Sequence, residues 1–198
     1  RIRFDGDGYS EQWQKEAERR KLSNNRNTPE ALQVLTAPES LELFRTMGVF
    51  TEKEVRARKE VELETYILQT QIEGRVLSEL VYNKVIPATV AYQNSLLRNI
   101  AGLKDVYGAA HKTMAEAQLG ILEHLAEHLQ AIRKKTDAMN EARKRANGMK
   151  DIEKKARAYC ESVLPYFDEI RYHADRLERM VSDTERPLAK YRDLLFIK

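Results

Sequence analysis

Apolar residues in the middle of the chain recur at steps of three and four, the spacing of one face of an α-helix. The pattern begins after Thr51 and Glu54, whose spacing is typical of an N-terminal capping box. It predicts a helix from Thr51 to about Leu103, which Pro87 is expected to kink or split. The inward positions would be Leu63, Ile67, Thr70, Gly74, Leu77, Val81, Val85, Ala88, Tyr92, Leu96, Ile100 and Leu103.

Two more long helices are predicted by the same spacing, one from about His111 to Ala146 and one from about Lys150 to Ser182. The Asn147-Gly148 pair between them is expected to end the first of these helices in a tight turn. Pro165 is expected to kink the second. Because the connections are short, consecutive long helices should fold back antiparallel.

Shorter helices are predicted before residue 51. Ser10 is a good N-cap for a helix over about residues 11–21, and Thr28 for a helix with Pro29 at its first position. A third would run from about Pro38 to Gly48. The expected fold is therefore all-α: a long antiparallel helical hairpin or three-helix bundle with short N-terminal helices.

Three segments follow from these patterns: a linker with short helices at 1–50, a long helical bundle at 51–185 and an apolar C-terminal tail at 186–198. The chain begins at Arg1 without a methionine, so we expect a fragment of a longer protein. An apolar tail needs a surface on which to dock. The predicted assembly contacts are Leu194, Leu195, Phe196 and Ile197.

Composition narrows the choice of function. Charged residues make up 33% of the chain, as long half-exposed helices require, and the net charge of +3 is too small to indicate nucleic-acid binding. Cys160 is the single cysteine; we expect it to be buried and inert in a reducing compartment. No run approaches about 18 apolar residues and no signal peptide is visible, so we expect a cytoplasmic protein without a membrane span.

Two short motifs resemble metal-binding patterns, but each has a better explanation that involves no metal. His124 and His128 share one helical face with Glu127 in an H-x-x-E-H pattern, but no third ligand is marked and the helix offers no cleft. Asp5 opens a sequence like a calcium loop in which Glu16 would take position 12. The turn at position 6 requires glycine, whereas Ser10 stands there, so a turn leading into a helix is favoured.

Basic residues concentrate around the Asn147-Gly148 turn. Residues 133–157 hold ten basic and four acidic side chains, an excess of six positive charges. A solvated hairpin tip is the simplest interpretation, and an acidic protein surface is an alternative partner. The residues that would form this basic tip are Arg143, Lys144, Arg145 and Lys150.

The sequence contains no glycine-rich phosphate loop, nucleophile elbow or cysteine-histidine metal set, so we assign no catalytic, cofactor-binding or metal residue. The residues alone thus predict a helical assembly or interaction module. The alternatives are a stand-alone coiled-coil adaptor whose basic tip binds an acidic protein and, as the weakest, a metalloenzyme built on the H-x-x-E-H pattern.

Three stretches resemble the C-terminal part of type III glutamine synthetases. They lie at residues 4–32, 166–178 and 187–197, in the family's order, although Arg186 and Ala189 replace an expected tryptophan and proline. The first stretch resembles the family's link out of the catalytic domain.

The resemblance implies a parent enzyme that makes glutamine from glutamate, ammonia and ATP with Mg or Mn, in an oligomer of two stacked rings. The ligands for that chemistry would lie upstream of Arg1. This chain would then be a non-catalytic domain without a cofactor of its own. Its partners would be the upstream catalytic domain and neighbouring subunits of a homo-oligomer.

Overall fold

The computed structural model describes residues 3–185 and Leu195, and it contains helices without any strand among these residues. This confirms the all-α prediction. The chain divides into two compact units, Arg1–Tyr66 and Ile67–Lys198, with helix α4 (Glu52–Leu80) contributing to both. The boundaries expected from sequence after residues 50 and 185 stay predictions.

The first unit holds the short helices that the sequence predicts before the long ones. They are α1 (Glu11–Arg19), α2 (Thr28–Gln33), the 3₁₀ turn η1 (Val34–Thr36) and α3 (Pro38–Thr46), followed by the start of α4.

Local side-chain caps explain where these helices begin. The Ser10 hydroxyl accepts from the Trp13 amide at 3.2 Å, as predicted. The capping box also forms, since the Glu54 carboxylate accepts from the Thr51 amide at 2.8 Å. The cap of α2 was assigned wrongly to Thr28: Asn27 occupies that position, and its side chain accepts from the Glu30 amide at 2.9 Å. An asparagine directly before a Thr-Pro pair is the better N-cap, because proline fits the first turn.

A buried lysine ties the early part of α4 to the segment before it. Lys59 is only 6% exposed, and its ammonium group donates to the Gln33 amide oxygen at 2.8 Å and to the Thr36 hydroxyl at 3.1 Å. Nearby, the Phe50 ring packs edge-on to Phe44 and lies 4.5 Å from the Arg58 guanidinium carbon. These polar and aromatic contacts therefore act in the first unit beside its buried aliphatic side chains, which include Val55 and Leu63.

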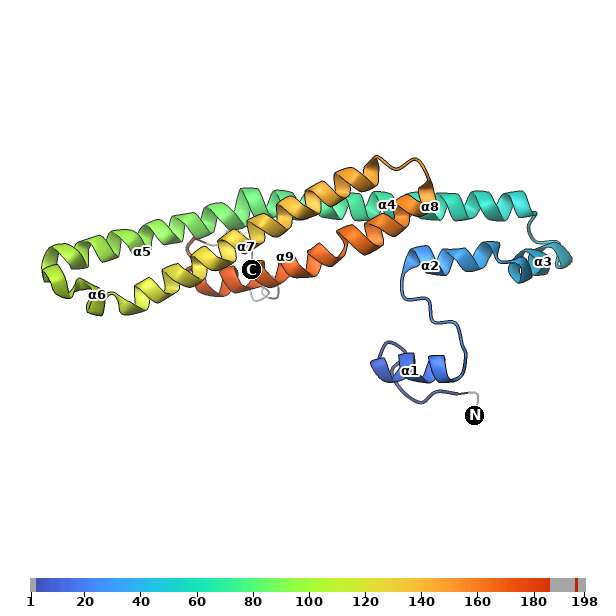
Figure 1. Cartoon of the computed structure of the whole chain (residues 1–198), viewed down its shortest axis with the longest axis horizontal. Helices are drawn as coiled ribbons and strands as arrows, with labels where there is room; N and C mark the ends of the chain where they lie inside the picture. Colours follow the sequence, from blue (N-terminus) through green and yellow to red (C-terminus); the bar gives the residue numbers. More distant parts are fainter. Residues whose placement is uncertain (1–2, 186–194, 196–198) are drawn as a thin grey trace. The chain divides into compact units, whose positions relative to one another are not determined.

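The second unit is built from three antiparallel helical rods, as Figure 1 shows for α5, α7 and α9. The first rod continues from α4 through η2 (Val81–Val85) into α5 (Ile86–Tyr107). After η3 (Gly108–Ala110) and the short α6 (His111–Met114), the second rod, α7 (Glu116–Asn147), returns. The third rod comprises α8 (Ile152–Ala158), η4 (Tyr159–Val163) and α9 (Pro165–Met180).

Each interior proline follows a π-helical turn. Proline lacks an N–H, and its ring clashes with the carbonyl four residues earlier. Before Pro87, the Ile86 amide donates to the Val81 carbonyl five residues back; before Pro165, the Leu164 amide donates likewise to Tyr159 at 3.0 Å. The expected kink or split thus takes the form of one widened turn, and the rods continue beyond it.

The core of the second unit runs along α7, whose fully buried side chains face both other rods. The buried apolar residues of this unit with at most 1% exposure are Val81, Ala115, Leu125, Ile132, Met139, Ala146, Ala156, Tyr159, Val163, Ile170 and Leu177.

Two details of this unit differ from the sequence-based expectation. The helix expected from His111 is interrupted at Ala115, which is fully buried and has φ of −102° and ψ of 11°. This small residue sits where the chain turns from α6 into α7. Cys160 is half-buried rather than buried, because it flanks the inward side of the π-helical turn η4.

Replacing Leu125 by alanine should lower the free energy of unfolding by about 2–5 kcal/mol, because Leu125 is fully buried and its removal leaves a cavity. The matched control is Leu97→Ala on α5, where the leucine is 52% exposed and a change within about 0.5 kcal/mol is expected. Urea unfolding followed by helical circular dichroism measures both. Equal effects of the two substitutions would contradict the assignment of the core.

Candidate functional site

The predicted basic residues lie where α7 ends, but they do not form one solvated tip. Lys144, Arg145 and Lys150 are exposed, and Lys144 forms an ion pair with Glu141 at 2.7 Å. Arg143 is half-buried, against the expectation of a solvated tip. It follows Met139 by four positions and precedes Ala146 by three, so it lies at the edge of the buried face of α7.

Arg143 borders a groove between two helices of the second unit, with a volume of about 480 Å³. We call it the Arg75–Arg143 groove. Helix α4 contributes Arg75 and Ser78, and α7 contributes Asp137, Asn140, Glu141, Arg143 and Lys144. The two helices are joined at the groove by a hydrogen bond from the Asn140 amide to the Ser78 hydroxyl at 2.8 Å.

The Arg143 side chain lies over Gly74 of α4. A Cβ atom at this buried position would lie 3.8 Å from Arg143 Cδ and 3.6 Å from the Phe167 ring. The stem of Arg143 is thus held over Gly74 beside an aromatic ring of α9. Its Nε atom is buried and has no hydrogen-bond partner among the described residues. Such an unsatisfied group costs on the order of 1–3 kcal/mol.

Two tyrosines with raised pKa values interact with residues that line the groove. Burial, followed by the hydrogen bond to Asp137, raises the pKa of Tyr82 to about 12. The Tyr159 hydroxyl donates to the Asn147 side chain at 2.7 Å, and burial raises its pKa despite the opposing charges of Arg143 and Arg75. Both phenols therefore stay protonated at neutral pH and act as hydrogen-bond donors.

The two histidines of the H-x-x-E-H pattern have different surroundings. His124 is exposed, with its Nδ1 atom 3.9 Å from the Glu127 carboxylate. His128 instead contacts His173 of α9, with 3.0 Å between their Nδ1 atoms. The sequence does not predict this pair, because the order of residues does not show which side chains of α7 and α9 lie opposite each other.

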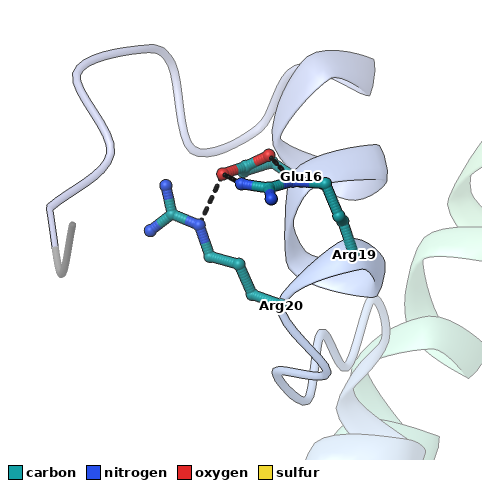
Figure 2. Close-up of polar contacts among 3 residues, drawn as sticks. All are labelled: Glu16, Arg19 and Arg20. Carbon is teal, nitrogen blue, oxygen red and sulfur yellow. Dashed lines mark hydrogen bonds and ion pairs between the residues drawn. The ribbon is translucent and has the colours of Figure 1, made fainter.

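The calcium-loop candidate has another explanation in the structure. Glu16 lies within α1, where both arginines that follow it bind its carboxylate, as Figure 2 shows. The contacts are 2.6 Å from Arg19 Nη2 and 2.5 Å from Arg20 Nε. These hydrogen bonds lower the pKa of Glu16 to about 2. The carboxylate therefore stabilises the end of α1.

Of the predicted assembly contacts, Leu195 is the one within the described part of the chain, and it is 77% exposed. Leu194, Phe196 and Ile197 lie outside the described residues, so their contacts stay predictions.

Together, these features define an all-α domain with a polar groove between α4 and α7 in the described part of the chain. Across residues 3–185, no group of three or more histidine, cysteine or acidic side chains is placed to hold a metal ion. No helix in this part of the chain is long and apolar enough to cross a membrane. Residues 1–104 match the family described as Glutamine synthetase C-terminal domain. The chain therefore belongs to the glutamine synthetase C-terminal domain family.

Similarity to individual relatives extends over the whole chain. The chain is 42% identical over 198 residues to a glutamine synthetase of Bacteroides fragilis (strain YCH46) and 29% identical over 196 residues to one of Butyrivibrio fibrisolvens. It is 28% identical over 205 residues to the type-3 glutamine synthetase of Dictyostelium discoideum.

The alignments cover 99–100% of this chain but only 27–28% of the relatives, so the chain spans about a quarter of their length. They confirm the resemblance to type III glutamine synthetases.

The contact between His128 and His173 should make the second unit sensitive to mild acid. Burial, then the neighbouring His128 and Lys135, lowers the pKa of His173, while Glu127 and Glu169 oppose the shift. The folded state therefore takes up this proton less readily than the unfolded chain. The stability contribution is complete above the usual histidine pKa of about 6.5 and falls as the pH drops below it.

We expect the melting temperature to fall between pH 7.5 and 5.5, and to fall less in His173→Gln. The matched control is His124→Gln, which removes an exposed histidine and should leave the wild-type pH dependence in place. Thermal unfolding of the three proteins across this range provides the measurement. Parallel pH profiles for wild type and His173→Gln would show that the pair does not couple to protons.

Proposed function

We propose that this chain is the non-catalytic helical domain of a type III glutamine synthetase, an ATP-dependent glutamate–ammonia ligase, and that it contributes packing and oligomer assembly. The observation that carries the proposal is similarity along the whole chain to glutamine synthetases of which it spans about a quarter. ATP and Mg or Mn would bind elsewhere in the parent enzyme, which we place in the cytoplasm. The same similarity argues against a stand-alone adaptor.

Exposed apolar side chains on the second unit support a role in packing. Leu68, Ile72 and Val76 follow one another at steps of four on α4 and are 56%, 51% and 48% exposed. At the other end of the rods, Val106 and Met114 are 75% and 53% exposed. The row on α4 places three exposed apolar side chains on one helical face, and a contiguous apolar patch of this kind marks a surface for interaction. The proposed partners are the catalytic domain of the parent and neighbouring subunits.

The 198-residue chain alone should form no glutamine from glutamate, ammonia and ATP, because its motifs supply no nucleotide or metal ligands. A coupled assay for phosphate release, with product identified by chromatography, tests this against the intact parent protein as the positive control. Turnover by the isolated chain would refute its non-catalytic role.

The apolar tail gives a test of the assembly role. Leu195→Asp combined with Phe196→Asp in the intact parent should weaken oligomer assembly or lower its melting temperature, because charges would enter an apolar contact. Arg192→Asp is the matched control, since it makes the same change in net charge without removing an apolar side chain. Analytical ultracentrifugation reports the oligomer. If the double variant sediments and melts like wild type, the tail is not an assembly contact.

A further inference from the structure

The Arg75–Arg143 groove has an imbalance between its cations and its anions. Its two carboxylates already have partners: Asp137 accepts from the Tyr82 hydroxyl and lies 3.9 Å from Arg133, and Glu141 pairs with Lys144 at 2.7 Å. Among residues 3–185, neither Arg75 nor Arg143 forms an ion pair or a hydrogen bond. The groove therefore presents two guanidinium groups without an internal counter-ion.

The two guanidinium groups act on the same region. Both arginines lie close enough to Tyr159 for their charges to act on its hydroxyl. Arg143 is held by its packing over Gly74 beside Phe167, whereas Arg75 is exposed on α4 and can move toward a ligand. One arginine is thus fixed before binding and the other is available to close on the bound group.

Neutral hydrogen-bonding groups also line the groove. The Ser78 hydroxyl accepts from one N–H of the Asn140 amide, which leaves the serine O–H and a second amide N–H to donate. The volume of about 480 Å³ is within the range of about 300–1,000 Å³ of small-molecule sites. A ligand with several acceptor oxygens would accept from these donors and from the guanidinium groups that line the groove.

We propose that the Arg75–Arg143 groove binds a phosphate group, either as the free ion or as part of a small phosphorylated metabolite. A phosphate monoester carries a charge of about −1.5 to −2 at neutral pH, which matches the two positive charges of the guanidinium groups. A single carboxylate would balance only one of these two positive charges. Arginine also suits phosphate geometrically, because its planar fork donates two parallel hydrogen bonds. The site lies within this chain and is independent of the assembly role.

Calorimetric titration of the 198-residue chain at pH 7.5 tests the proposal, with sodium chloride holding the ionic strength constant. The probes are inorganic phosphate, glucose 6-phosphate, glucose and poly-L-glutamate. We expect saturable binding of one phosphate per chain, or of one glucose 6-phosphate, and none of glucose. If inorganic phosphate binds more tightly, the ligand is the free ion; if glucose 6-phosphate binds more tightly, the ligand is a phosphorylated metabolite. Absence of saturable binding by both would overturn the proposal, as would binding of poly-L-glutamate alone, which would indicate an acidic protein partner.

Variants distinguish binding at the groove from non-specific attraction of phosphate to the basic residues of the chain. Arg75→Gln and Arg143→Gln should each weaken binding by about tenfold or more, because each removes charged hydrogen bonds to the ligand. Arg145→Gln is the matched control: it removes the same charge from an exposed neighbour outside the groove and should preserve affinity within about twofold. An equal loss in Arg145→Gln would overturn the site.

A folding control and a variant with a more positive groove accompany these substitutions. Arg75 is exposed, so Arg75→Gln should fold even if Arg143→Gln does not, and circular dichroism checks both. Glu141→Gln removes a negative charge from the groove and releases Lys144, so it should tighten phosphate binding. Weaker binding in that variant would contradict the proposed position of the phosphate.

Discussion

The buried face of α7 is the constraint on which the second unit depends. Leu125, Ile132 and Met139 follow at steps of seven and are fully buried, which requires neighbours on both sides of the helix over several turns. Helix α5 covers one flank and α9 the other (Figure 1). Burial of these side chains supplies the largest favourable contribution available to a fold of long, half-exposed helices. Polar groups such as Arg143 are therefore placed by the packing of this face.

The π-helical turns maintain the alignment of the other two rods with that face. Val81, Val85 and Thr89 are buried at successive steps of four, but an α-helix overshoots a full turn by about 40° at each such step. A widened turn offsets this drift, and it also removes the carbonyl clash of the following proline. Tyr159 and Val163 repeat the arrangement before Pro165. The prolines therefore accompany a local change of helical period in rods that stay continuous.

The sequence predicts the helices well because their signals are local. Apolar spacing, the cap at Ser10 and the capping box at Thr51 each act within a few residues, and the structure contains all of them. The cap at Asn27 was missed in favour of Thr28, since two adjacent residues carried nearly the same signal. The contact between His128 and His173 depends on the vertical alignment of two rods, which side-chain packing determines and a single sequence does not report.

The groove shows why a count of charges is a poor guide to a site. The sequence gives residues 133–157 an excess of six positive charges, but helical phase divides them, because Arg145 faces solvent while Arg143 lies beside the buried face. One signal could have indicated this: the position of Arg143 between Met139 and Ala146. Arg75 carries no such signal, because its role depends on a groove that exists only when α4 and α7 pack together.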